Sequence, residues 1–160
     1  MGRASGVLLA VSSLPNSYGI GTFGKEAYDF IDFLVRTKQR YWQVLPLTTT
    51  SYGDSPYQSF SAAAGSPYYI DLKDLEKLGY LKSDDFEDIS FGTSNTCVDY
   101  GTLFVNHRRL LNRAFDRFMQ DVPADFEKFC HDHAEWLDPY AEFMSLKEEF
   151  GHKAYWEWPK

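Results

Sequence analysis

A segment in the first half of the chain, Tyr52 to Ser61, carries the side chains best suited to binding or chemistry. Its sequence is Tyr-Gly-Asp-Ser-Pro-Tyr-Gln-Ser-Phe-Ser. Aromatic rings pack on the apolar C–H face of a sugar ring, and hydroxyl, amide and carboxylate groups bind the sugar hydroxyls. The segment interleaves both kinds of group and therefore favours a carbohydrate site. The alternative is a loop that folds its own aromatic rings inward.

A second motif, Gly19 to Gly24, has the sequence Gly-Ile-Gly-Thr-Phe-Gly and precedes a predicted helix. This spacing occurs in dinucleotide-binding loops, where the first glycine directly follows a strand and an acidic residue ends the next strand. Here Ser12 to Tyr18 separate the motif from the first predicted strand, and the second strand ends in Leu-Pro-Leu. We therefore predict a turn with tight backbone packing that binds no nucleotide.

The histidines and cysteines indicate no further site. His131 and His133 are two positions apart on a predicted helix, which places their side chains about 200° apart and prevents them from sharing one ion. Cys97 and Cys130 form neither a Cys-x-x-Cys pair nor a disulfide framework. We expect a reduced, cytoplasmic chain that uses no metal and no cofactor.

Charge and hydropathy exclude two classes of partner. The formal net charge of the 160 residues is -7, and no basic cluster is present to bind a nucleic-acid backbone. The early apolar run, Val7 to Val11, is too short for a signal sequence. No stretch approaches the roughly 20 apolar residues of a membrane span. We therefore expect neither nucleic acid nor membrane as a partner.

The elements that position the Tyr52 to Ser61 segment begin with a β-α-β unit. A continuous apolar run after Gly6, Val7 to Val11, is typical of a strand buried on both faces of a parallel sheet. Lys25 to Lys38 has apolar residues at helical spacing, and Tyr41 to Leu45 form a second strand. Strands joined in this way lie parallel, which predicts an α/β fold.

A long segment from Thr48 to Pro67 shows neither helical nor strand periodicity. A structureless loop of this length inside a compact domain is either functional or a sign that the elements are wrongly assigned. It leaves the carboxyl end of the second predicted strand, which is the face where β/α barrels build their active sites. We therefore interpret it as a functional loop.

The rest of the chain is predicted to be mostly helical. A short helix spans Leu72 to Leu78 and ends at Gly79, and a long helix spans Leu103 to Met119. Pro123 and Pro139 each open a further helix. The apolar stripes of the three long helices should form core. They contain Phe104, Leu111, Phe115 and Phe118, then Phe126, Phe129, Cys130 and Trp136, and finally Tyr140, Phe143, Met144 and Phe150.

Together these elements predict the start of a (β/α)8 TIM barrel. Residues 1–70 supply its first two strands and first helix, and residues 71–160 form an inserted, mostly helical subdomain. A complete barrel takes about 250 residues, so 160 residues with two barrel strands cannot close one. We therefore expect a fragment from which the remainder of the barrel is absent.

Five motifs occur in an order that resembles the amylomaltases, the 4-α-glucanotransferases also called disproportionating enzymes. They are Ser-Ser-Leu-Pro at 12–15, Tyr-Gly-Ile-Gly at 18–21, Tyr-Trp-Gln-Val-Leu-Pro-Leu at 41–47, the block 52–61, and Trp-Glu-Trp-Pro at 156–159. Asp-Ser-Pro-Tyr-Gln-Ser is the most specific part of the resemblance. A departure is Thr48 to Ser51, where the family more often has glycine.

The resemblance implies a TIM barrel enzyme that transfers one α-1,4-glucan segment onto the 4-hydroxyl of another, so its partners are maltooligosaccharides and α-1,4-glucans. In the retaining mechanism an aspartate nucleophile and a glutamate acid/base act through a covalent glycosyl-enzyme. The family's catalytic residues fall outside this chain. Asp54 and Asp71 are therefore expected to be non-catalytic.

The resemblance also implies roles for particular side chains. Tyr57 matches the ring that stacks on the donor sugar next to the scissile bond, and Ser55 and Gln58 flank it as polar contacts or loop braces. Tyr52 and Tyr100 match tyrosines of a second glucan groove away from the catalytic centre. For Tyr100 the alternative is a packing role in the helical subdomain.

Two other functions stay open from the sequence. A hydrolytic α-glucosidase or amylase on the same barrel uses the same intermediate, with water in place of the sugar hydroxyl. A non-catalytic glucan-binding module would instead fold by itself as a 160-residue unit and bind maltodextrin.

Overall fold

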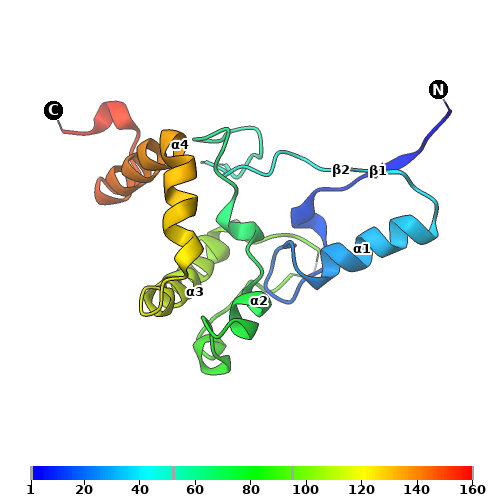
Figure 1. Cartoon of the computed structure of the whole chain (residues 1–160), viewed down its shortest axis with the longest axis horizontal. Helices are drawn as coiled ribbons and strands as arrows, with labels where there is room; N and C mark the ends of the chain where they lie inside the picture. Colours follow the sequence, from blue (N-terminus) through cyan, green and yellow to red (C-terminus); the bar gives the residue numbers. More distant parts are fainter. Residues whose placement is uncertain (1, 52, 95, 160) are drawn as a thin grey trace.

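The computed structural model describes residues 2–51, 53–94 and 96–159 (Figure 1). Its strands and helices are, in order, β1 (Gly6–Leu8), α1 (Lys25–Arg36), β2 (Tyr41–Gln43), α2 (Leu72–Lys77), α3 (Tyr100–Phe118) and α4 (Ala124–Glu149). Short 3-10 turns occur at Val11–Ser13, Pro67–Tyr69, Ser83–Phe86 and Tyr155–Glu157. The predicted α/β class and the order of the elements up to α3 are confirmed.

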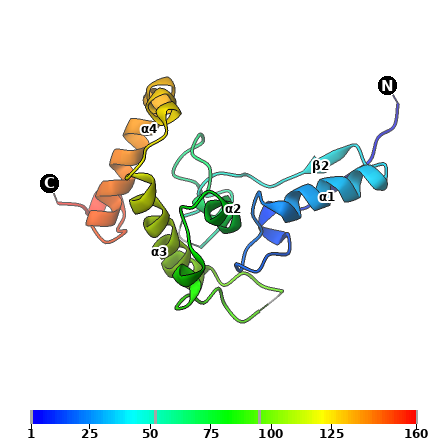
Figure 2. The same ribbon diagram turned by 60° about the horizontal axis from the view of Figure 1, so that its bottom comes forward.

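The two strands pair in parallel, as predicted. Val7 lies opposite Trp42 in the ladder, between the Gly6–Tyr41 and Leu8–Gln43 pairs. Helix α1 runs alongside this sheet in both views (Figures 1 and 2), and its Phe30 ring packs edge-on against Trp42 at 5.0 Å between centroids. The Trp42 indole also donates a hydrogen bond of 2.8 Å to the Leu9 carbonyl oxygen. The ring contact packs α1 against one face of the sheet, and the indole hydrogen bond joins β2 to the residue after β1.

The other face of the sheet is open, which contradicts the predicted burial on both faces. Leu8 and Tyr41 point away from the Val7 side and are 59% and 65% exposed. In the described part of the chain, α1 covers only the face that carries Trp42. Both strands also end earlier than predicted, because the chain enters the Val11–Ser13 turn after β1 and reaches Pro46 after β2.

Helices α3 and α4 form an antiparallel pair. The end of α3 meets the start of α4 through Phe118 and Phe126, whose ring centroids are 5.1 Å apart. At the opposite end Phe104 contacts His152 at 5.3 Å. Arg108 and Glu148 form an ion pair between the two helices. The pair is therefore held at both ends, by aromatic contacts and one ion pair.

The predicted third long helix, opening at Pro139, is wrong, because α4 is one helix that contains Pro139. Proline removes one backbone donor and bends a helix, but the hydrogen bonds of the turns on either side can continue it. Figure 1 shows α4 changing direction along its length. The proline therefore redirects the chain without ending the helix.

The predicted core stripes of α3 and α4 are only partly confirmed, because Leu111 packs against the buried cluster but most of the other residues do not form core. The buried residues of α3 are Leu103, His107, Leu110 and Ala114, whereas Phe104 and Phe115 of the predicted stripe are 48% and 56% exposed. The buried face is the one that lies against α2 and the segment after it, where Leu72 and Leu81 join the same cluster. No described residue of α4 is fully buried. Its aromatic residues pack at the surface.

The Gly19 to Gly24 motif is a tightly packed turn, as predicted. A Cβ atom on Gly21 would lie 2.0 Å from the Val11 carbonyl oxygen, and one on Gly24 would lie 1.9 Å from an Asp71 carboxylate oxygen. Gly19 has a φ of 79°, which favours glycine. Glycine is required here because other parts of the chain approach the backbone closely.

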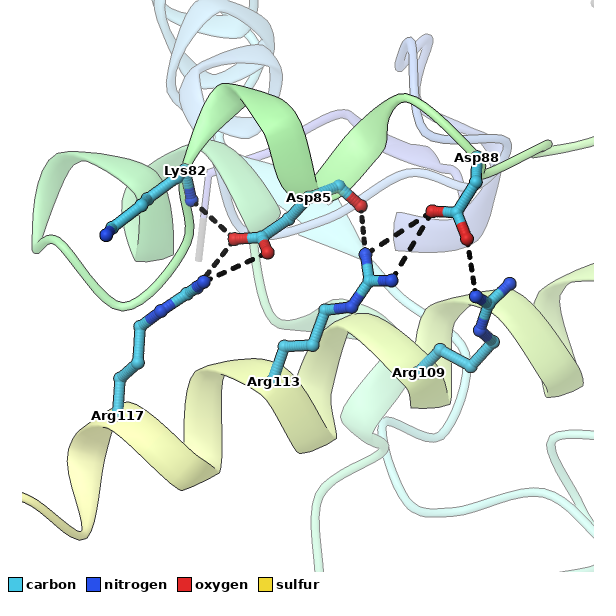
Figure 3. A network of polar contacts seen from close by, with 6 residues as sticks. All are labelled: Lys82, Asp85, Asp88, Arg109, Arg113 and Arg117. Carbon is cyan, nitrogen blue, oxygen red and sulfur yellow. Dashed lines mark hydrogen bonds and ion pairs between the residues drawn. The ribbon is translucent and has the colours of Figure 1, made fainter.

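Three arginines of α3 attach it to the turn Ser83–Phe86 and the residues after it (Figure 3). Arg117 donates to both carboxylate oxygens of Asp85, at 2.6 and 3.0 Å. Arg113 donates to the Asp85 carbonyl oxygen and contacts the Asp88 carboxylate, which also pairs with Arg109. This network fixes the segment after α2 along the side of α3.

The described residues contain neither a membrane-spanning helix nor a cluster of metal-binding side chains. Neither α3 nor α4, nor any shorter helix in these ranges, combines the length and apolar character of a membrane crossing. Within the same residues no group of three or more His, Cys, Asp or Glu side chains is arranged to hold a metal ion.

Candidate functional site

The loop from Thr48 to Pro67 is closed at its base. Thr48 and Gly65 form an antiparallel bridge. The Ser66 amide donates to the Leu47 carbonyl oxygen at 2.9 Å, and the Thr49 amide donates to the Ala64 carbonyl oxygen at 3.3 Å. The loop therefore leaves and returns at one point after β2, like a compact surface loop whose ends lie close together.

Hydroxyl groups give the inside of the loop its shape. The buried Thr49 hydroxyl shares a hydrogen bond of 3.1 Å with the Ser59 hydroxyl. Ser59 also donates to the Ser61 carbonyl oxygen at 2.7 Å. The Ser61 hydroxyl accepts from the Ala63 and Ala64 amides, both at 3.1 Å. These serines and threonine stabilise the loop itself.

Tyr57 stands outward from this braced loop. Its side chain is 73% exposed. The turn that carries it is held by Ser55, whose carbonyl oxygen accepts from the Gln58 amide at 3.1 Å and whose hydroxyl accepts from the Tyr57 amide at 3.4 Å. Gln58 is exposed beside it. The alternative of a loop that folds its rings inward does not describe Tyr57.

The loop has a strained turn at Gly53 and Asp54. Their φ angles are 91° and 55°, in the left-handed region that non-glycine residues seldom adopt. Burial raises the pKa of the Asp54 carboxyl above its ordinary value. Burial raises the pKa of Tyr68 to about 12, and the Asp54 charge adds to the increase. The pKa of Tyr100 is also raised, mainly by burial and further by Asp54.

Tyr100 is held in an aromatic column that leads into the core. It is the first residue of α3, where Asp99 caps the helix by accepting from the Thr102 amide at 3.0 Å. The Tyr68 ring packs edge-on against Tyr100 at 6.0 Å between centroids and against His107 at 5.7 Å. The structure thus joins Tyr100 to the end of the loop, although the two are distant in sequence.

His107 lies at the inner end of this column. Its side chain is 1% exposed, and neither ring nitrogen has a hydrogen-bond partner among the described residues. Burial lowers the pKa of His107 to about 4, so the ring is neutral at pH 7. Neither Tyr68 nor His107 was predicted from the sequence. The two adjacent tyrosines directly after the loop could have indicated Tyr68, whereas no sequence pattern distinguishes His107.

Two further residues considered in the sequence are Tyr52 and Asp71. Tyr52 lies outside the described residues. Asp71 caps α2 by accepting from the Asp74 amide at 3.0 Å, and its other carboxylate oxygen accepts from the Thr22 hydroxyl at 2.5 Å. Asp71 is therefore engaged in joining α2 to the glycine motif.

A hollow of about 660 Å³ lies apart from the loop, between residues 12–20 on one side and residues 91–94 and 96–98 on the other. Its lining is mostly polar and includes Ser12, Asn16, Glu26 and Thr96. Among its described lining residues Phe91 alone is aromatic, so this hollow offers less ring surface for a sugar than the loop does. The sequence analysis did not predict it.

Comparison with known proteins matches almost the whole chain to 4-alpha-glucanotransferases. Residues 9–160 match the family model described as 4-alpha-glucanotransferase. The 4-alpha-glucanotransferase of Streptococcus pneumoniae serotype 4 is 55% identical over 159 residues, which cover 98% of this chain and 31% of that protein. The Thermus thermophilus 4-alpha-glucanotransferase is 46% identical over 161 residues, again covering 98% and 31%.

A solved structure agrees with these relatives. The amylomaltase from Streptococcus agalactiae in complex with acarbose superposes with a TM-score of 0.93 at 50% sequence identity, over 99% of this chain and 32% of that one. The chain thus spans about a third of the length of the proteins it matches. The predicted resemblance to amylomaltases is confirmed, and the chain belongs to the 4-alpha-glucanotransferase family.

Proposed function

We propose that this chain serves as the amino-terminal part of a 4-alpha-glucanotransferase that transfers α-1,4-glucan segments between maltodextrin or starch-type chains. The match of residues 9–160 to the family carries this proposal. The acarbose complex of the Streptococcus agalactiae amylomaltase, 50% identical to this chain, supports a glucan-type ligand. The full-length enzyme is, in this proposal, a protein of the relatives' length that includes the chain.

In this enzyme the β1-α1-β2 unit is the start of a (β/α)8 barrel, and residues 71–160 are an inserted helical subdomain. Two separate hydrophobic clusters support this division. One, around Val11, Leu14 and Ala27, lies within the β-α-β unit. The other is centred on Leu72, Leu81, Leu110 and Ala114.

Tyr57 stacks on the donor sugar beside the bond that is broken. Its exposed ring on a loop braced by Thr49 and Ser59 supports this role, because a stacking face must be both accessible and fixed. Ser55 braces the turn under Tyr57. Gln58, exposed next to the ring, binds sugar hydroxyls.

Tyr100 and Tyr52 contribute to a second glucan groove. The support for Tyr100 is its ring contact with Tyr68, which directly follows the Thr48 to Pro67 loop. A tyrosine held edge-on by another ring keeps its orientation without a ligand, which lowers the entropic cost of binding. Long glucans would reach this groove while short donors would not.

The retaining chemistry itself comes from an aspartate nucleophile and a glutamate acid/base outside these residues. Asp71 is neither the nucleophile nor the acid/base in this proposal, because both of its carboxylate oxygens already accept hydrogen bonds. Asp54 lies on the strained turn with Gly53 and is not a catalytic group in this proposal. The reaction as proposed uses no cofactor.

Maltotriose supplied to the full-length enzyme tests the proposal. A transferase yields glucose and longer maltodextrins with a constant total of reducing ends. A hydrolase raises that total, and a non-catalytic binding module changes nothing, so either result contradicts the proposal. The 160-residue chain alone should show no turnover. Turnover by this chain that Asp54→Asn abolishes would show that the catalytic residues were wrongly placed.

A further inference from the structure

Phe60, in the Thr48 to Pro67 loop, contacts helix α4. The ring of Phe60 packs against Phe143 with 5.8 Å between centroids and an interplanar angle of 47°. The ammonium of Lys147 lies 4.9 Å from the centroid of the same Phe60 ring. Phe143 and Lys147 are one helical turn apart on α4, so they present a ring and a cation to Phe60 together. The loop lies beside α4 in Figure 1.

The two residues that contact Phe60 are themselves fixed. Phe143 packs on Trp158 at 5.6 Å between centroids, and the Trp158 indole donates to the Lys153 carbonyl oxygen at 3.3 Å. Lys147 donates to the carbonyl oxygens of His152 and Lys153, both at 3.1 Å. The chain after α4 therefore holds both partners of Phe60 in place.

Phe60 lies where its position can affect the orientation of Tyr57. The two residues are three positions apart on the loop, and both line a shallow hollow of about 340 Å³ with Pro46 and Thr48. The base of the loop is closed at the Thr48 bridge. The contact of Phe60 with α4 adds a second fixed point beyond Tyr57, so the exposed ring lies between two anchored positions.

We propose that Phe60, Phe143 and Lys147 are positioning residues for the donor-sugar site. The α4 contact on Phe60 holds the loop so that Tyr57 presents its face at the geometry the reaction needs. This inference rests on the proposed function, because it assigns the residues a task in glucan transfer. A small displacement of a positioning ring costs rate because reaction requires the reacting atoms to be closely aligned.

The test uses the full-length enzyme with variants on α4. Phe143→Ala removes the ring under Phe60, and Phe129→Ala is the matched control: it lies on the same helix, is 47% exposed, and contacts His133 of its own helix. We expect Phe143→Ala to lower kcat/KM on maltotriose about 10-fold, with part of the loss in kcat. Phe129→Ala should stay within about 2-fold. Phe143→Tyr keeps the ring and should restore most of the rate.

Lys147→Met tests the cation separately, because it keeps an apolar chain of similar length against Phe60. A cation over an exposed aromatic ring makes a modest contribution, so the expected loss in kcat/KM is about 2- to 5-fold. The carbonyl contacts of Lys147 are lost in the same variant. Thermal unfolding measured beside the kinetics separates any general loss of structure from the loss of rate.

A double-mutant cycle with Tyr57 distinguishes positioning from a merely structural role. If Phe143 acts through Tyr57, then Phe143→Ala in a Tyr57→Ala background should cost less than about 2-fold. Independent, multiplicative losses would overturn the proposal, as would equal rates for Phe143→Ala and Phe129→Ala. If Phe143→Ala does not fold, Phe143→Leu supplies the same comparison. An unmodified full-length enzyme without transferase activity would instead refute the proposed function.

Discussion

Thr22 donates a buried hydrogen bond of 2.5 Å to the carboxylate of Asp71, and this bond joins the residues before α1 to the start of α2. Thr22 is 0% exposed and Asp71 is 9% exposed. The Thr22 hydroxyl also accepts from the Asn16 side-chain amide at 3.1 Å. The bond therefore links the β-α-β unit to the helical half of the chain at a point that water does not reach.

Replacing Thr22 by valine should destabilise the protein. The substitution keeps the shape but leaves a buried Asp71 oxygen without its donor, which costs about 1–3 kcal/mol. Thr93→Val, at an exposed position, is the control and should change stability by less than about 0.5 kcal/mol. Chemical unfolding of the full-length protein measures both. Equal midpoints for the two variants would show that the Thr22 bond contributes nothing.

Gly24→Ala should also be destabilising, whereas Gly65→Ala should be tolerated. A Cβ atom on Gly24 would lie 1.9 Å from Asp71 Oδ2, while one on Gly65 would meet nothing within 4 Å. Because Asp71 is held on both oxygens, it cannot move away freely, and overpacking of this kind costs about 1–3 kcal/mol. The same unfolding measurement compares the two alanines. A tolerated Gly24→Ala would contradict the close packing of the glycine motif.

Acid should weaken the network on α3 through Asp85. The hydrogen bonds from Arg117 are the main reason that the pKa of Asp85 is lowered from 3.8 to about 2. The folded state therefore binds this proton less readily than the unfolded state. The resulting stabilisation, about 1–3 kcal/mol, is fully present above about pH 5 and is lost as the pH falls towards 2.

Asp85→Asn should accordingly destabilise the protein at pH 7 and have a smaller effect near pH 2. Asp84→Asn, at an exposed neighbouring position, is the control. Unfolding curves collected from pH 7 to pH 2 give the difference between each variant and the unmodified protein. A difference for Asp85→Asn that stays constant over this range would refute the role of the carboxylate charge.

Tyr57 and Tyr52 should differ in their effect on catalysis by the full-length enzyme. Burying one face of a ring is worth roughly 1.5–3 kcal/mol, so Tyr57→Ala should lower kcat/KM about 10- to 100-fold, partly through kcat. Tyr52→Ala should leave kcat on maltotriose nearly unchanged and alter the handling of long glucans. Steady-state kinetics with both substrates measures this. Equal kcat losses on maltotriose would mean that the two roles are wrongly divided.

The glycine motif should bind no nucleotide. Its glycines are occupied by close contacts with Val11 and Asp71, which leave no room for a phosphate against the backbone. Titration calorimetry with NAD and with ATP should therefore give no binding heat. Micromolar binding of either compound would refute the interpretation of this turn.

The sequence by itself determined the local elements and the family. The apolar run after Gly6, the helical spacing from Lys25 and the second strand at Tyr41 predicted the parallel β-α-β unit, because these patterns depend on neighbouring residues. The motifs around Asp-Ser-Pro-Tyr-Gln-Ser identified the family. The glycine turn was also predictable, since its spacing did not fit a nucleotide loop.

Only the tertiary structure decided which faces are buried and which distant residues meet. On α3 several apolar faces compete, and the packing of Leu72 and Leu81 selects the face with Leu110 and Ala114. The Thr22–Asp71 bond and the packing of Phe60 on Phe143 join residues far apart along the chain. Such contacts carry no local periodicity, because they depend on how the finished elements pack against one another.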